Sequence, residues 1–248
     1  MSESIIREPG LAAIHPEWEA FEKQFPIPPL LGSPQQLRQL KFPKSSSPPI
    51  GFSIRDVEIP GYQGATNQLR LYTPDDSSEP LPIVIYVHGG GWTMGDLDSE
   101  TKVCRMMFNR DQVFENIDSL GGASDKIIIA GLSAGGNIAA VLAQRARSAA
   151  NIAFRGQILR VPLVVHEDAL PREFDFSSYT ENASAPILPS AAVTQCLGYY
   201  GGPPEDIRMS PLLAKDFSGL PPAYIQVAGA DPLRDDGFAY AERLREAG

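Results

Sequence analysis

The 248-residue sequence predicts an α/β fold with a doubly wound, mostly parallel sheet. Three observations lead to this prediction. Apolar, β-branched strand segments alternate along the chain with helix-forming segments. Pro82–Val87 is a continuous apolar run, as expected of a strand buried on both faces of its sheet. Lys126–Ala140 reads as a strand, a sharp glycine-containing turn and a helix that follows at once.

Length and composition restrict the function before any motif is considered. The chain could form one α/β domain or two small ones, and 43% hydrophobic residues suffice for a sizeable core. A net charge of -9 and a pI near 4.9 argue against nucleic acid or an anionic membrane as the main partner. The two cysteines, Cys104 and Cys196, lack metal-like spacing, so we expect neither a metal site nor a disulfide framework.

The N-terminal region gives no targeting signal. Met1–Gly10 is polar and charged, and no stretch of the sequence reaches the length of a membrane span. We therefore expect a cytoplasmic protein without a membrane span. Leu11–Phe25 has apolar residues at spacings of three and four, which predicts an amphipathic helix that either packs on the body or forms a lid. Pro26–Pro49 reads as an irregular connector with a helical turn near Gln35–Leu40.

The rest of the chain supplies the sheet and its helices. An antiparallel hairpin is expected from Phe52–Ile59 and Gln68–Tyr72, joined by the turn Gly61–Asn67. The further expected strands are Pro82–Val87, Lys126–Ala130, Gly156–Val161 and Ala223–Val227, and the further expected helices are Asp98–Phe108, Val113–Leu120, Ala134–Arg147 and Asp235–Glu246. Pro171–Gly202 has few strand signals, so we expect an insertion over the carboxyl ends of the strands.

The turn Gly131-Leu132-Ser133-Ala134-Gly135 is the candidate nucleophile site. Ser133 at its apex is expected to have a strained backbone, which lifts its hydroxyl clear of the main chain. Gly131 and Gly135 lack side chains, so strand and helix can approach closely. The helix that follows offers free N–H groups, and the Ala134 N–H can bind an oxyanion.

His88-Gly89-Gly90-Gly91-Trp92 follows the Pro82–Val87 strand directly. Acyl transfer needs hydrogen-bond donors for a developing oxyanion, and glycine lets main-chain N–H groups approach the reacting carbonyl. Gly89 and Gly90 are therefore candidate donors together with Ala134, with Gly91 supporting the loop; an ordinary glycine-rich turn is the alternative. We expect His88 to hold this loop rather than to act as a base.

Asp231 follows the Ala223–Val227 strand. A carboxylate at the end of a strand, after the nucleophile in chain order, suits the triad order serine, aspartate, histidine. Asp231 would then accept a hydrogen bond from a base histidine. The alternative is a helix N-cap, but Asp235 and Asp236 fit the helix N-terminus better and leave Asp231 for the catalytic role.

These three motifs together resemble the hormone-sensitive-lipase-like family of esterases and lipases. The resemblance rests on H-G-G-G-W, G-L-S-A-G-G-N and G-A-D-P-L-R-D-D-G in this order, with Ser210-Pro211-Leu212 and Leu220-Pro221-Pro222. It implies an α/β-hydrolase fold with a helical lid domain (the cap domain), a small-molecule ester substrate and no cofactor. It also implies Ser133 as nucleophile, Asp231 as acid, and Gly89, Gly90 and Ala134 as oxyanion hole. We place the N-terminal part of the cap domain in residues 1–50, the hydrolase domain in 51–248 and the cap insertion at about 166–205.

The sequence also departs from the family pattern. Leu132 replaces the usual acidic residue before the nucleophile. Nothing between Arg110 and Gln112 matches the family's next strand and the segment after it, so we expect one central strand to be lacking. The family's last strand and catalytic histidine would come after Gly248, so we expect both to be absent as well.

The three histidines are His15, His88 and His166, and only His166, after the Gly156–Val161 strand, is a candidate replacement base. The alternative is a histidine without a catalytic role, which either has its hydrogen bonds satisfied or faces solvent. The sequence thus predicts a serine carboxylesterase for small to medium acyl esters. We expect its hydrolysis to be impaired because the catalytic histidine is missing. A binding protein that holds a small ligand without catalysis is the second hypothesis, and the oligomeric state stays open.

Overall fold

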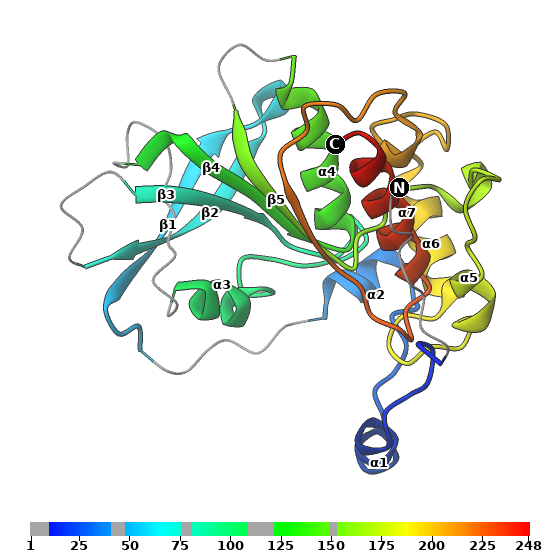
Figure 1. The fold of residues 1–248 in the computed structure, drawn as a ribbon. Helices are drawn as coiled ribbons and strands as arrows, with labels where there is room; N and C mark the ends of the chain where they lie inside the picture. The colour runs from blue at the N-terminus through cyan, green and yellow to red at the C-terminus, as the bar shows by residue number, and fades with distance from the viewer. Residues whose placement is uncertain (1–9, 41–47, 76–80, 109–121, 149–152) are drawn as a thin grey trace.

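The computed structural model describes residues 10–40, 48–75, 81–108, 122–148 and 153–248. Its centre is a parallel sheet with the strand order β3-β4-β5-β6 (Figure 1). The strands are β3 (Leu81–Val87), β4 (Gly122–Leu132), β5 (Phe154–Arg160) and β6 (Ala223–Gln226). A separate antiparallel hairpin is formed by β1 (Phe52–Pro60) and β2 (Thr66–Pro74). The predicted α/β class, the hairpin and all four parallel strands are confirmed.

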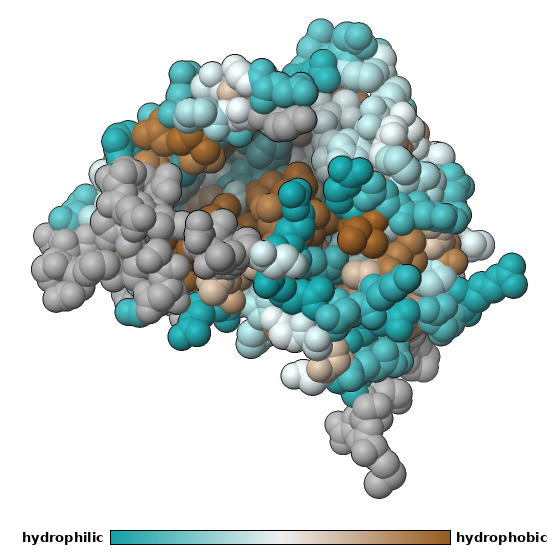
Figure 2. Space-filling model, turned by 90° about the horizontal axis from the view of Figure 1, so that it is seen from above, coloured by the Kyte–Doolittle hydropathy of each residue, from teal (hydrophilic) through white to brown (hydrophobic). Residues whose placement is uncertain are grey.

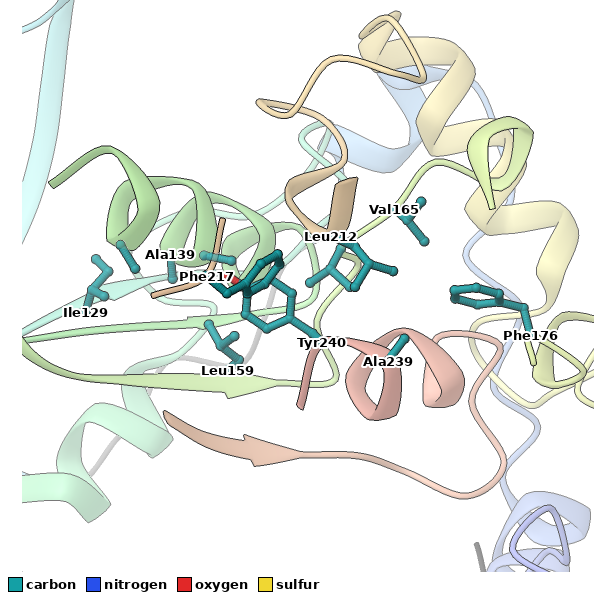
Figure 3. Close-up of a cluster of buried hydrophobic side chains, with 12 residues drawn as sticks. Ile129, Ala139, Leu159, Val165, Phe176, Leu212, Phe217, Ala239 and Tyr240 are labelled. Carbon is teal, nitrogen blue, oxygen red and sulfur yellow. The ribbon is translucent and has the colours of Figure 1, made fainter. Parts of the chain in front are cut away.

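Two helices pack against the sheet around one core. They are α4 (Ala134–Ala146) and α7 (Arg234–Glu246), and Figure 3 shows their side chains meeting those of Ile129 and Leu159 on the strands. The α4 residues in this core are alanines, whose small side chains allow close contact with the sheet. Tyr240 of α7 is fully buried, and its ring lies edge-on to Phe217 at 5.3 Å.

The other helices are short. They are α1 (Pro16–Gln24), α2 (Pro34–Arg38), α3 (Thr101–Phe108), α5 (Ser178–Glu181) and α6 (Ser190–Tyr200), with 3-10 turns at η1 (Tyr62–Gly64), η2 (Glu167–Ala169) and η3 (Pro211–Leu213). None of the helices in the described part of the chain is long and apolar enough to cross a membrane. Figure 2 shows that the face seen from above is hollowed, with hydrophobic residues in the hollow and hydrophilic ones around it.

The N-terminal helix was expected either to pack on the body or to form a lid, and the structure shows neither arrangement. It begins at Pro16 rather than at Leu11, because proline suits the first helical position and His15 caps the helix. No residue of α1 is buried, and the helix stands away from the body (Figure 1). The aromatic rings of the helix and of its C-cap, Phe25, lie beside one another instead: the ring centroids of Trp18 and Phe21 are 5.7 Å apart, and those of Phe21 and Phe25 are 5.3 Å apart.

The strand β3 forms one edge of the parallel sheet. As expected, it pairs with β4 in parallel, with Val87 opposite Gly131. Among the described residues no strand pairs with the other edge of β3, and the hairpin remains a sheet of its own. The expected helix at Asp98–Phe108 begins at Thr101, whereas the one expected at Val113–Leu120 lies outside the described residues. The absence of a central strand and of a last strand stays a prediction.

Candidate active site

Ser133 lies in the sharp turn between β4 and α4, and its backbone is strained as predicted. Its φ of 54° and ψ of -119° are unusual for a residue with a side chain. The Ser133 N–H donates to the Arg160 carbonyl at 2.9 Å, and the Ser133 carbonyl accepts from the Asn137 N–H at 3.0 Å. Strain of this kind costs about 1–3 kcal/mol and persists only where the surrounding structure enforces it. Ser133 therefore sits on a rigid turn, and the residue is partly exposed.

The glycines on either side of Ser133 are required by close backbone contacts. A Cβ atom on Gly131 would collide with the Gly135 carbonyl, and one on Gly135 would collide with the carbonyls of Val87 and His88. Gly136 is also tight, since its Cβ would lie 3.0 Å from the Pro162 side chain. The prediction that these glycines let strand and helix approach closely agrees with this geometry.

The loop after β3 runs beside this turn. Gly90 and Gly91 have φ values of 125° and 54°, and a Cβ on either would collide with Met94 or Cys196 respectively. The Gly90 carbonyl accepts from the N–H groups of Thr93 and Met94, at 3.0 and 2.9 Å. Among the described residues no main-chain hydrogen bond of this loop uses the N–H of Gly89 or Gly90. Both N–H groups therefore remain available to a ligand.

Ser133 and the glycine loop line one pocket with a cavity volume of about 240 Å³. Most of the lining side chains are apolar. The lining residues are Leu30, Gly89, Gly90, Gly91, Trp92, Met94, Ser99, Glu100, Leu132, Ser133, Ala134, Val161, Leu163, Ile187, Leu188, Val193, Cys196 and Leu233. Leu30 and the residues from 187 to 196 come from the segments that we expect to form the cap domain. The pocket thus lies between these segments and the carboxyl ends of the strands.

Aromatic and main-chain contacts hold the pocket's outer wall together. The ring of Trp92 stacks on that of Tyr200, with centroids 4.5 Å apart and planes inclined by 20°. Gly32 joins the N-terminal segment to α6, because its N–H donates to Gln195 Oε1 at 3.1 Å and its carbonyl accepts from the Tyr199 hydroxyl at 3.0 Å. These bonds fix the segment that carries Leu30 over the pocket.

His88 is exposed, and it does not line the pocket. Its Nδ1 lies 2.6 Å from the Gly89 carbonyl, so a proton on Nδ1 is donated to the glycine loop. This contact has the form expected of a histidine that holds the loop.

His166 is buried but also lies outside the pocket lining. Its Nδ1 accepts from the Asp168 N–H at 3.1 Å and so caps η2, while its own main-chain N–H donates to Ser210 Oγ at 2.9 Å. The structure therefore favours a histidine with satisfied hydrogen bonds over a replacement base. His15 caps α1, where its Nδ1 lies 3.3 Å from the Glu17 N–H. None of the three histidines of the chain lies with Ser133 in the described pocket.

Asp231 lies in the loop between β6 and α7. Its Oδ1 accepts from the Leu233 N–H at 2.8 Å, which forms a local turn before α7; Leu233 is the N-cap of this helix, and no side chain caps it. Burial raises the pKa of Asp231 to about 6, against the effect of this hydrogen bond. Two strand positions separate β4 from β6, so Ser133 and Asp231 follow strands about 10 Å apart. That separation suits a bridging group better than a direct hydrogen bond.

As expected, Asp235 and Asp236 lie in the first turn of α7, but neither carboxylate makes a cap hydrogen bond to this helix. Both are fully buried, and their carboxylates bind distant main-chain groups instead. Asp235 Oδ2 accepts from the Ser178 N–H at 2.8 Å, and Asp236 Oδ1 accepts from Val164 and Val165 at 2.9 and 3.3 Å. Buried carboxylates need such donors, which a capping role at an exposed helix end would not supply. The sequence signal for this role is weak: two adjacent carboxylates after Arg234.

A parallel sheet whose strand β4 ends in a strained, glycine-flanked serine, followed at once by a helix, is the arrangement of an α/β-hydrolase. The model of the family described as "alpha/beta hydrolase fold" matches residues 109–248, and that of BD-FAE matches residues 69–120. The chain belongs to the α/β-hydrolase family, in its hormone-sensitive-lipase-like group of carboxylesterases.

Individual relatives agree with this assignment. The chain is 38% identical to carboxylesterase NlhH of Mycobacterium tuberculosis, over 86% of this chain and 75% of that protein. It is 36% identical to esterase LipI of the same organism, over 79% and 70% of the two chains. Among solved structures, the esterase of Pyrobaculum calidifontis is 32% identical with a TM-score of 0.70, over 79% of this chain and 73% of that one.

Within the described residues, no group of three or more histidine, cysteine, aspartate or glutamate side chains is placed to hold a metal ion.

Proposed function

We propose that Ser133 is the nucleophile of a carboxylic ester hydrolase that acts on small to medium acyl esters. One observation carries the proposal: the strained Ser133, the unused N–H groups of Gly89 and Gly90, and Ala134 at the start of α4 all line the same pocket. An ester carbonyl placed there has a nucleophile on one side and hydrogen-bond donors on the other.

The reaction follows from these groups in two steps. Ser133 Oγ attacks the ester carbonyl, its proton leaves to a base, and the oxyanion that forms is stabilised by the N–H groups of Gly89, Gly90 and Ala134. The C–O bond to the alcohol then breaks, and the alcohol takes up a proton. Water attacks the acyl-enzyme in the same way, which releases the carboxylic acid and restores Ser133.

Asp231 is the candidate acid of this machinery. Asp231 follows β6 and Ser133 follows β4, so both lie beyond the carboxyl ends of parallel strands, which supports that assignment. The gap of about 10 Å between their strands would accommodate a histidine ring between the two side chains. In such an arrangement Asp231 orients the histidine and stabilises its charged form.

The pocket supports a restricted range of ester sizes. A cavity of about 240 Å³ with a mainly apolar lining suits acyl chains of modest length better than long lipid chains. The relatives named carboxylesterases and esterases support ester hydrolysis as the reaction.

We expect the rate of the 248-residue chain to be low. His15, His88 and His166 all lie outside the pocket, so no histidine in this chain is positioned to take the Ser133 proton. General-base help contributes about a hundred- to ten-thousand-fold, whereas the oxyanion donors remain. The same observation favours a second candidate function, the binding of a small apolar ligand without turnover.

Hydrolysis of p-nitrophenyl acetate and butyrate tests the proposal, with Ser133→Ala as the matched variant. Slow turnover that disappears in Ser133→Ala would support the esterase. Turnover that survives in this variant would contradict Ser133 as the nucleophile. Tight binding of butyrate esters, with no turnover above that of Ser133→Ala, would support the second candidate instead.

A further inference from the structure

Three hydrogen-bonded polar side chains reach from β5 over β4 to β3 and end at the pocket. Arg160 Nη1 donates to the Tyr86 hydroxyl oxygen at 3.1 Å, and the Tyr86 hydroxyl lies 3.5 Å from Glu100 Oε2. A tyrosine hydroxyl has one proton, and arginine cannot accept it. The Tyr86 proton therefore points toward Glu100, and the two bonds orient the carboxylate in one direction.

The sheet is built to bring these side chains together. Tyr86 is on β3 and Arg160 on β5, with β4 between them, so the two strands are about 10 Å apart. The β4 residue opposite Tyr86 is Ala130, whose partner on β5 is Ile158, so Arg160 lies two residues further along β5 on the same face of the sheet as Tyr86. Gln226 Oε1 accepts from Arg160 Nε at 2.8 Å and holds the guanidinium in place.

Glu100 contrasts with the rest of the pocket lining. It is the one lining residue among those described that carries a charged side chain, and most of its neighbours there are apolar. The Ser99 hydroxyl is already engaged, since it accepts from the Asp96 N–H at 2.8 Å. Within the described part of the chain, the hydrogen bond of Glu100 uses Oε2. Burial raises the pKa of Glu100, while the charge of Arg160 opposes that shift.

We propose that Glu100 is a specificity-determining residue that selects esters carrying a hydrogen-bond donor, either a hydroxyl or an amine. This inference rests on the proposed ester-binding function of the pocket. A fully apolar ester would displace water from the Glu100 carboxylate and leave its Oε1 without a partner, which is unfavourable. A hydrogen-bond donor on the ester restores the lost hydrogen bond. The site therefore discriminates by the difference in binding free energy between the donor-bearing ester and the apolar ester.

Binding measured without turnover tests this inference separately from catalysis. Dissociation constants are measured by calorimetry in the Ser133→Ala protein for three pairs of nearly isosteric esters. They are 2-hydroxyethyl butyrate against propyl butyrate, ethyl 3-hydroxypropanoate against ethyl butyrate, and 2-(dimethylamino)ethyl butyrate against 3-methylbutyl butyrate. The first two pairs place a hydroxyl on the alcohol or the acyl half, and the third pair tests a cation.

We expect the donor-bearing ester to bind at least fivefold more tightly in one or more pairs, and Glu100→Leu to abolish that preference. In Glu100→Gln, which keeps an uncharged acceptor, a hydroxyl preference should persist while an amine preference falls. A ratio below fivefold in all three pairs, or a preference unchanged by Glu100→Leu, would overturn the inference. If Glu100→Leu does not fold, the Glu100→Gln comparison decides for the amine pair, and the ratios in the Ser133→Ala protein decide for the hydroxyl pairs. Absence of turnover in the parent chain would count against the proposed function alone.

Discussion

Gly135, in the first turn of α4, lies directly against the main-chain carbonyl of Val87 at the end of β3. Helix and strand approach so closely here that a single added methyl group has no space. Because both partners are backbone, neither can move aside without shifting a whole element. This contact places the oxyanion loop, which begins at His88, beside the serine turn.

We therefore expect Gly135→Ala to lower the free energy of unfolding by about 2 kcal/mol or more, as overpacking of a core does. Gly198→Ala is the matched control, because Gly198 is helical in α6 and a Cβ there meets nothing within 4 Å. That change should be neutral or should stabilise the protein by up to about 1 kcal/mol. Urea denaturation of the two variants measures both values, and equal effects would contradict the close contact.

Asp231 makes stability depend on pH. Its folded pKa is about 6 against an ordinary value of 3.8, so the folded protein holds the proton over a range where the unfolded chain has lost it. Stability from this group is thus full below about pH 4 and is lost as the pH rises through about 6. Asp231→Asn keeps an acceptor for the Leu233 N–H and removes the ionisation.

The gain in stability of Asp231→Asn over the parent should therefore grow by about 1–3 kcal/mol between pH 4 and pH 8. Denaturation at both values checks this, and the other titrating groups cancel in the difference between the two proteins. A difference that stays constant with pH would show that the carboxyl of Asp231 is not buried as described.

Asp236 should matter for its oxygen rather than for its charge. Burial raises the pKa of Asp236 well above its usual range, while Oδ1 accepts from the N–H groups of Val164 and Val165. Asp236→Asn retains an acceptor and should change the free energy of unfolding by less than about 1 kcal/mol. Asp236→Ala leaves two buried N–H groups without a partner and should cost about 2–5 kcal/mol. Comparable losses in both variants would refute this account.

His166 should contribute to stability and not to rate. Its Nδ1 caps η2 outside the pocket lining, so His166→Ala should lower the free energy of unfolding by about 1 kcal/mol. The residual hydrolysis of p-nitrophenyl butyrate should stay within about twofold of the parent at a temperature where both are folded. A loss of turnover as large as that of Ser133→Ala would instead identify His166 as the base.

The sequence by itself determined the parts of this protein that depend on neighbours along the chain. The parallel strands are readable because each is a short apolar run, and the serine turn because Gly131, Ser133 and Gly135 act within five consecutive residues. Close packing of strand on helix requires those glycines, whatever the rest of the chain does.

Tertiary structure alone decided the partners of the buried carboxylates and of Glu100. Asp236 binds Val164 across 72 residues of sequence, and Asp235 binds Ser178 across 57, so their neighbours in the chain gave no sign of these partners. Glu100 is joined through Tyr86 to Arg160, which is 60 residues further along the chain on β5. Hydrophobic patterning is local and readable from the sequence, whereas a buried polar group takes its partner from whichever segment the fold brings to it.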